Sequence, residues 1–343
     1  VRASLAGLAF TGPNLPATGS FYRFKGFKNN KYMTSTVNAD NTGHLNMKEV
    51  TGVENTPETV FYWDNNNRLV ALSNGKCLGN FTNKGTNFHL FLAADDNSSS
   101  NVQFRHVLDG DGNFYFNILP SNNRYLHNGG STVDCAGGDS DGNYRWLIEE
   151  VKWLPISINE EAGYATLCSP VSLKKGYNSD RVKAYAGTIE GDYLNLTEIE
   201  GDIPANTPVV LQYVFDIQPN KCVYLGTMGA AASYEGQNDL DGKILAESVP
   251  EDASVLTLQL LDGKAGFYKY TSDMLNGFKA YITGDDANFA VNGFSFNTGG
   301  TTGVDGVKTE RKNEVFYDLN GRMVTYPSKG IYVTASGKKV LLK

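Results

Sequence analysis

Hydrophobic and polar positions follow the same layout three times between residues 20 and 151. Each copy has strands of alternating apolar and polar residues, a turn rich in asparagine or glycine, and an aromatic closing strand. The equivalent positions include Tyr32, Cys77 and Tyr125 in early strands, His44, His89 and Asp134 in middle strands, and Trp63, His106 and Trp146 in closing strands. One such unit cannot bury its apolar face alone, so neighbouring copies must pack together. The pattern predicts an all-β fold in which three repeats over 20–154 close into a β-trefoil.

A second region, 155–305, contains short apolar or alternating runs every 10 to 20 residues, separated by Gly, Asn, Asp or Pro. This spacing predicts an antiparallel β-sandwich. Residues 306–343 contain three further strand candidates and are too few to form an independent core, so we expect a small β-sheet that packs on the sandwich. Residues 1–19 form a lead-in or linker, and we expect either a mature protein or the C-terminal part of a longer one.

Composition narrows the functions that this chain can have. It has 343 residues, 41% hydrophobic and 20% charged, with 37 Gly, 19 Tyr and 18 Phe, which is typical of β-rich globular domains. The formal net charge of −7 argues against a nucleic-acid partner, which requires clustered Lys and Arg. No apolar run reaches the roughly 18 residues of a membrane span, so we expect no membrane insertion.

The residue types needed for catalysis are sparse. The four histidines all lie in the repeats, and no serine-hydrolase elbow, metalloprotease helix or phosphate loop is present. Cys168 has no histidine near it in sequence, and we interpret it as a core thiol; Cys77 and Cys135 replace apolar residues of the other repeats. A disulfide stays possible. We therefore expect no catalytic residues, no metal site and no cofactor.

Two acidic segments could be either calcium-binding loops or plain turns. Residues 109–113 and 139–143 have the DxDxN spacing that can supply three oxygens to a hard cation. Both lack the later bidentate glutamate and fall between predicted strands, which favours plain turns.

Sugar binding requires an aromatic face for the ring and amides or carboxylates for its hydroxyls. In the second repeat, strand alternation turns Phe91 outward, Gln103 precedes the closing strand and Asn80 follows an early strand. In the third repeat, His127 and Asn143 are the corresponding candidates. The structural alternative is that Phe91 packs under a loop and Gln103 caps a turn.

The repeat block resembles the ricin B-type β-trefoil lectins. The resemblance rests on SNGKCL at 73–78, on its counterparts NNKYM and NNRYL, and on the closers FYW, FRH and YRW. It implies three binding positions in each repeat. The aspartate position holds Thr34, Gly79 and His127, the stacking position holds Asn46, Phe91 and Ala136, and the amide position holds Val60, Gln103 and Asn143. No repeat retains the aspartate, and only the second retains the stacking aromatic.

The remaining sequence resembles two other patterns. YATLCSPVSL and IPANTPVVL look like a β-rich module of surface and secreted proteins in Gram-negative gut bacteria, and DLNGR with KGIY looks like a type IX secretion sorting unit. These resemblances imply a secreted protein or one on the outer cell surface. We expect a non-catalytic carbohydrate-binding accessory region whose partner is a glycan, and whose full-length chain includes an upstream enzyme. The alternative is a structural or adhesive spacer with no ligand pocket.

Overall fold

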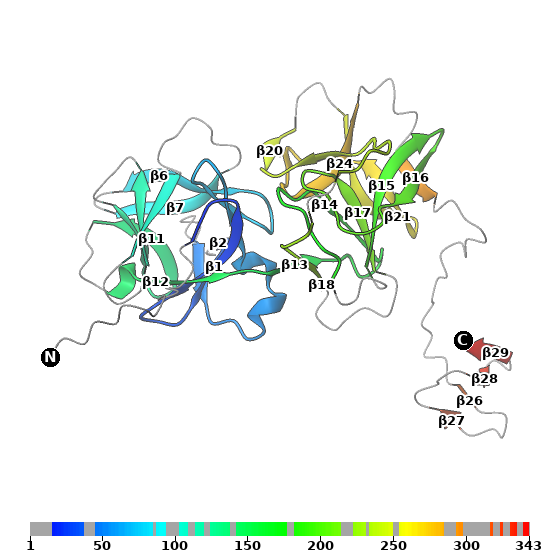
Figure 1. Cartoon of the computed structure of the whole chain (residues 1–343), viewed down its shortest axis with the longest axis horizontal. Helices are drawn as coiled ribbons and strands as arrows, with labels where there is room; N and C mark the ends of the chain where they lie inside the picture. The colour runs from blue at the N-terminus through cyan, green and yellow to red at the C-terminus, as the bar shows by residue number, and fades with distance from the viewer. Residues whose placement is uncertain are drawn as a thin grey trace, which may run out of the picture. The chain divides into compact units, whose positions relative to one another are not determined.

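The computed structural model describes residues 16–37, 45–84, 87–93, 103–108, 114–119, 124–137, 142–176, 182–213, 222–230, 233–249, 254–284, 293–297, 316–317, 323–324, 330–334 and 339–342. The protein is all-β, as predicted, apart from short 3-10 turns. It divides into two compact units, Val1–Thr298 and Gly299–Lys343. The first unit contains the repeats and the sandwich region (Figure 1).

The three repeats form three sets of four strands, joined in a 12-stranded sheet. The first repeat has β1 (Ser20–Gly26), β2 (Tyr32–Val37), β3 (Leu45–Lys48) and β4 (Phe61–Trp63), with the 3-10 turns η1 (Val53–Asn55) and η2 (Pro57–Thr59) before β4. The second has β5 (Leu69–Ala71), β6 (Cys77–Lys84), β7 (Asn87–Ala93) and β8 (Gln103–Leu108). The third has β9 (Phe114–Leu119), β10 (Tyr125–Asn128), β11 (Thr132–Ala136) and β12 (Trp146–Glu150), with η4 (Gly142–Tyr144) before β12.

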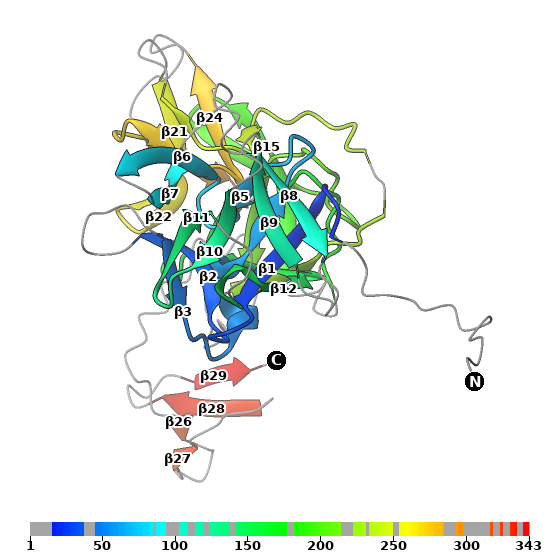
Figure 2. The ribbon, with the colours of Figure 1, turned by 90° about the vertical axis from the view of Figure 1, so that its left-hand side faces the viewer.

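The strand pairing is that of a β-trefoil. The first and last strands of the repeats form a barrel through the pairs β12–β1, β1–β4, β4–β5, β8–β9 and β9–β12. A backbone hydrogen bond of 2.7 Å from Phe104 N to Asn67 O links the second repeat's closing strand to the turn that precedes its first strand. The middle strands form three hairpins, and β11 pairs with both β3 and β7. Figure 2 shows β8, β9, β12 and β1 side by side.

Equivalent positions of the repeats meet in the trefoil core. Met33, Leu78 and Leu126 each follow the Tyr/Cys/Tyr position and are each fully buried. Trp146 is also fully buried, and its indole Nε1 donates a hydrogen bond of 3.0 Å to Leu126 O. A β-trefoil requires this arrangement, because each of its three hairpins must place an apolar side chain in the core that the repeats share.

The strands of the second region form a nine-stranded sheet and two small ladders. The nine strands are β14 (Tyr164–Leu167), β17 (Val209–Tyr213), β15 (Val182–Glu190), β16 (Tyr193–Glu198), β25 (Gly293–Asn297), β22 (Lys264–Lys269), β21 (Ser254–Leu261), β24 (Lys279–Gly284) and β19 (Asp241–Lys243), in spatial order. The ladders are β13 (Trp153–Ser157) with β18 (Cys222–Gly226), and β20 (Glu247–Ser248) with β23 (Met274–Leu275).

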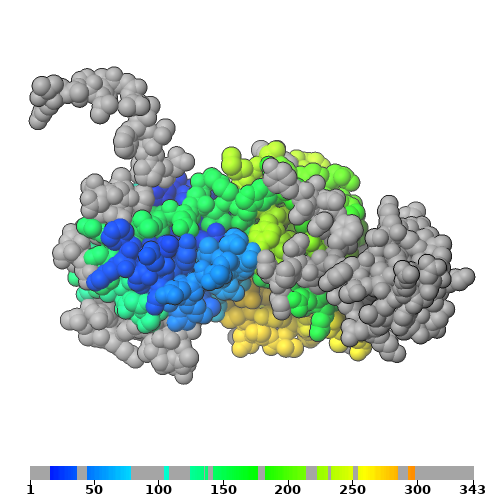
Figure 3. Space-filling model, turned by 90° about the horizontal axis from the view of Figure 1, so that it is seen from below, coloured from blue at the N-terminus to red at the C-terminus, as the bar shows by residue number. Residues whose placement is uncertain are grey.

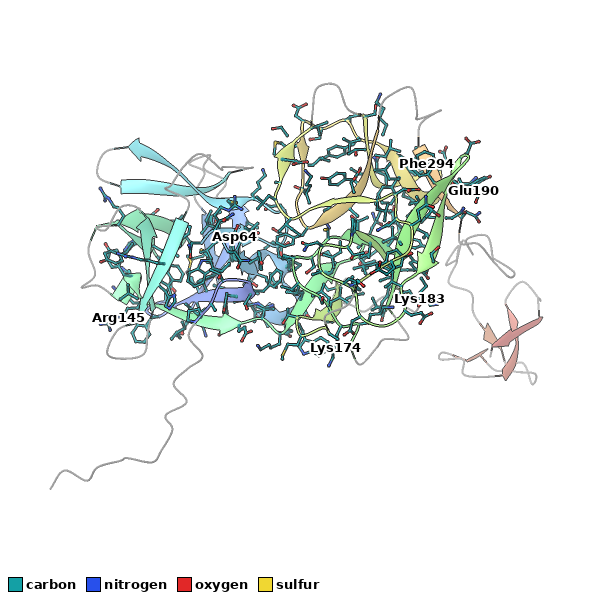
Figure 4. All side chains as sticks on the ribbon, turned by 45° about the horizontal axis from the view of Figure 1, so that its top comes forward. Asp64, Arg145, Lys174, Lys183, Glu190 and Phe294 are labelled. Carbon is teal, nitrogen blue, oxygen red and sulfur yellow. The ribbon has the colours of Figure 1, made fainter. Side chains whose placement is uncertain are left out.

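The nine-stranded sheet folds over on itself as a sandwich. Leu194 and Val210 from its first half share an apolar cluster with Phe267, Ile282 and Phe294 from its second half (Figure 4 labels Phe294). The halves join at β16 and β25, which run parallel, whereas the other pairs in the sheet are antiparallel. The prediction of a sandwich is confirmed, with this one parallel pair added.

A continuous apolar cluster joins the trefoil to the sandwich. Phe278 packs its ring against Phe21 and Tyr62, with centroid distances of 5.9 and 6.3 Å. The turn after β5 also bonds to the sandwich backbone, because Gly277 N donates to Asn74 O and Ala246 N donates to Gly75 O, each at 2.8 Å. The SNGKCL segment therefore begins at the interface between the two halves of the first unit.

The second unit is a four-stranded antiparallel sheet (Figure 2). Its strands are β26 (Phe316–Tyr317), β27 (Met323–Val324), β28 (Gly330–Thr334) and β29 (Lys339–Leu342). Three were predicted; β27 is too short to show a pattern in the sequence. Its packing on the sandwich stays a prediction.

Cys168 is a buried thiol with little reactivity. Its exposed fraction is 3%, and burial raises the pKa of its thiol to about 11. Because the thiolate is the nucleophile, and about one such thiol in a thousand is ionised near pH 8, we expect negligible alkylation of native Cys168 by iodoacetamide. Peptide mapping by mass spectrometry checks this, with protein unfolded in urea as the fully reactive control. Rapid modification of native protein would contradict the burial.

Candidate functional site

The second-repeat candidates are placed only by their backbone. Gly79 pairs with Phe91 across the β6–β7 hairpin, and Asn80 follows at an irregularity in this pairing. Gln103 begins β8, opposite Leu119 of β9. The side chains of Asn80, Phe91 and Gln103 lie outside the described part of the chain, so their sugar-binding roles stay predictions. Residues 109–113 and 139–141 of the two acidic turns also lie outside it.

The third repeat brings a carboxylate to the position of His127. His127 on β10 pairs in register with Asp134 on β11, and its Nδ1 lies 4.0 Å from Asp134 Oδ2. Both side chains remain partly exposed, by 19% and 21%. Gly129, at the turn of this hairpin, leaves room for the carboxylate, because a Cβ there would lie 2.9 Å from Asp134 Oδ2.

Tyr144 connects His127 to the segment that carries Asn143. The Tyr144 ring lies 4.7 Å from the His127 ring, with an interplanar angle of 51°, and 6.3 Å from the Tyr125 ring. Its hydroxyl donates a hydrogen bond of 3.3 Å to Gly137 O, which fixes η4 against the hairpin. Asn143 precedes Tyr144 and is half-buried. The two predicted residues of the third repeat are thus held beside the same tyrosine.

The first repeat adds an aromatic side chain near η4, the segment that carries Asn143 and Tyr144. Phe27, in the turn after β1, is 44% exposed, and the Arg145 guanidinium lies 6.0 Å from its ring centroid. Phe27 N donates a hydrogen bond of 3.0 Å to Arg145 O. Arg145 is labelled in Figure 4, and Figure 3 shows the blue surface of the first repeat beside the green surface around β12. Residues far apart in sequence therefore form one continuous face.

Sequence reasoning missed Asp134 and Tyr144. Asp134 stands at the position of His44 and His89, and this difference between repeats was visible. Its meaning depends on the β10–β11 register, which places it opposite His127. Tyr144 fills the first position of the closing motif, where the other repeats have phenylalanine, and it was not proposed as a site residue.

His127, Asp134 and Asn143 are partly exposed, and Tyr144 beside them is buried. These four residues, here called the third-repeat surface, present an imidazole, a carboxylate and an amide that can form hydrogen bonds to a polyhydroxylated ligand. Among the residues that the structure describes, no group of three or more His, Cys, Asp or Glu side chains is placed to hold a metal ion. In that same part of the chain, no helix has the length and hydropathy of a membrane span.

Comparisons with known proteins give low similarity. No protein-family model and no curated protein matches the chain. The ricin B-like lectin of Macrolepiota procera in complex with lactose matches at 12% identity, over 40% of this chain and 99% of its own, with a TM-score of 0.33. The designed 3-fold symmetric protein ThreeFoil matches at 18% identity, over 38% and 99%, with a TM-score of 0.33. Cry35Ab1 matches at 7% identity, over 78% and 88%, with a TM-score of 0.32. The trefoil assignment rests on the strand pairing above and not on these scores.

Proposed function

We propose that the first unit is a non-catalytic carbohydrate-binding region that holds a glycan at the third-repeat surface. The observation that supports this most is the pairing of His127 with Asp134. The resemblance to ricin B-type lectins implies an aspartate at position 127, where this chain has histidine. Asp134 on the facing strand β11 supplies a carboxylate, and its Oδ2 lies 4.0 Å from His127 Nδ1. We therefore expect Asp134 to provide the carboxylate acceptor that position 127 lacks.

The chemistry of these groups suits sugar hydroxyls. A carboxylate oxygen accepts hydrogen bonds from sugar hydroxyls, and such charge-assisted bonds are stronger than neutral ones. Asp134 Oδ1 is buried, so Oδ2 is the oxygen that a ligand would reach. The imidazole of His127 and the amide of Asn143 can donate or accept as the ligand requires. The surface is partly exposed, so we expect weak binding at one site, and several sites on one polysaccharide would be needed for tight attachment.

Asp134→Asn is expected to weaken glycan binding tenfold or more, because it keeps the shape of the side chain and removes a charged acceptor worth about 1.5–3 kcal/mol. A glycan array on the whole chain identifies the ligand, and titration calorimetry measures the affinity. His44→Ala is the matched control, because it changes the equivalent position in the first repeat and should leave the affinity unchanged.

Other outcomes distinguish the alternatives. If Phe91→Ala abolishes binding and Asp134→Asn does not, the site lies in the second repeat, with Asn80 and Gln103. If no glycan on a broad array binds the folded protein, the region is a spacer or adhesive module.

We further propose that the protein is exported to the outer surface of a Gram-negative bacterium. The resemblance of the last residues, DLNGR and KGIY, to a sorting unit supports export. Fractionation of the producing cells tests it, and a purely cytoplasmic protein would contradict it.

A further inference from the structure

The sandwich contains a cavity that is separate from the third-repeat surface. β14 is an edge strand of the nine-stranded sheet, and it packs against β24 without pairing to it. This unpaired contact between the two halves leaves a cavity of about 270 Å³, here called the sandwich cavity. Its volume is close to the lower end of the range for small-molecule pockets, about 300–1,000 Å³.

The sandwich cavity has a polar rim and a polar interior. Ser157, Asn159 and Asn276 line it and are exposed, so they form the rim. Asn159 Oδ1 accepts hydrogen bonds from Glu161 N and Ala162 N, each of 3.0 Å, which leaves its Nδ2 hydrogens available.

Thr166 lies at the interior wall. It is only 5% exposed, and no hydrogen bond joins its hydroxyl to any described residue. Its hydroxyl is not among the described side-chain atoms that are both fully buried and without a partner, so it keeps some exposure and can bond to a molecule in the cavity.

Lys279 is the one charged side chain among the described residues that line the cavity. No hydrogen bond or ion pair joins its ammonium to another described residue. Lys279 is half-buried. By contrast, the buried Lys175 of the sandwich donates a hydrogen bond of 2.5 Å to Ile199 O. Lys279 also lines a smaller cavity of about 80 Å³ with Glu58, but no ion pair forms between them. Burial among protein atoms lowers the pKa of Lys279, which is the expected result for an ammonium without a nearby counter-ion.

Tyrosine rings supply the apolar part of the wall. Tyr164, Tyr270 and Tyr281 all line the cavity. Their hydroxyls are held by other groups, since Tyr164 Oη accepts from Gln212 Nε2 at 2.9 Å and Tyr270 Oη donates to Met274 O at 2.7 Å. The rings are therefore fixed, and fixed aromatic faces are suited to the C–H side of a sugar ring.

We propose that the sandwich cavity binds a uronic acid, a single sugar ring with one carboxylate, whose carboxylate pairs with the Lys279 ammonium. The hydroxyls of the ring would bond to Thr166 and to the rim amides. The absence of aspartate and glutamate from the described lining favours an acidic ligand over a neutral or basic one. The cavity volume limits the ligand to about one ring.

Galacturonate and glucuronate are the probes, measured by calorimetry on the whole chain. Lys279→Met keeps the length of the side chain and removes the charge, and it is expected to weaken binding at least tenfold. The matched control is Lys243→Met, because Lys243 pairs in register with Lys279 from β19 and does not line the cavity. Galactose and acetate, which lack the charge and the ring respectively, are expected to bind at least tenfold more weakly than the uronates.

Thermal unfolding adds a readout that a merely structural lysine would not give. Removing a half-buried charge that has no ion-pair partner among the described residues should raise the Tm of the ligand-free protein by about 2–4 °C, while Lys279→Met loses the stabilisation by uronate that the wild type shows. The proposal is overturned if neither uronate binds the wild type, if Lys279→Met binds as the wild type does, or if galactose or acetate binds equally well. Asp134→Asn is expected to leave uronate binding unchanged, which separates this site from the trefoil surface.

Discussion

Trp146→Ala is expected to destabilise the first unit by about 3–5 kcal/mol, the range for removing a large aromatic residue from a core. Trp146 is among the largest fully buried side chains of the protein. Its loss leaves a cavity where β12 meets β1 and β9. It also leaves Leu126 O without the indole donor, so the third hairpin loses its bond to the closing strand. Urea denaturation followed by circular dichroism measures the change.

Trp153→Ala is the control for this prediction. Trp153 is 37% exposed and lies on β13, outside the trefoil barrel. Its ring covers Lys174, with the ammonium 5.9 Å from the ring centroid. Because the side chain is less buried, we expect a smaller loss, about 1–2 kcal/mol. Equal losses for the two variants would contradict the role of Trp146 as the residue that closes the third repeat.

The trefoil was predictable because its signal is repeated. Three copies of one pattern place Met33, Leu78 and Leu126 at equivalent positions, and a chance match in one copy would not recur in the others. A substitution within the pattern can also keep the packing of the residue that it replaces. His106 replaces a tryptophan and still packs edge-on to Trp63, at 5.4 Å, and burial lowers its pKa.

The candidate binding residues were harder to predict, because their arrangement depends on pairing across strands. A pattern along one strand shows that His127 faces outward, but not which residue stands opposite. The β10–β11 register decides this and supplies Asp134. The role proposed for Lys279 also depends on neighbours from other strands. Within the run KAYI it is one polar residue of an ordinary strand, and its significance arises from the cavity beside β14.

The interface between trefoil and sandwich was not predictable from sequence patterns. The turn at 73–76 was interpreted through its resemblance to a lectin motif, yet its glycine serves the contact with the sandwich. Gly75 approaches Gly277 and Ile244, which are far away in the sequence and belong to no repeat. Close contact between two glycine backbones has no periodic signal, because the glycines bear no side chain that could alternate.

Gly75→Ala is therefore expected to be strongly destabilising, by about 2–5 kcal/mol from backbone strain and overpacking together. Gly75 has a φ of +72°, and a Cβ there would lie 2.2 Å from Gly277 Cα and 2.8 Å from Ile244 O. Because neither contact is a flexible side chain, the two halves of the first unit must separate to relieve the clash. Differential scanning calorimetry should then show a lower Tm and separate trefoil and sandwich transitions.

Two control variants separate the causes of this expected loss. Gly163 has the same φ of +72° and nothing within 4 Å of its Cβ position, so Gly163→Ala isolates the backbone strain, about 1–2 kcal/mol. Gly277→Ala isolates the clash, since its Cβ would lie 2.1 Å from Ile244 O and its φ is not positive. If Gly75→Ala loses no more stability than Gly163→Ala, the close approach of the two glycines does not hold the trefoil to the sandwich, and the apolar contacts of Phe278 with Phe21 and Tyr62 must do so alone.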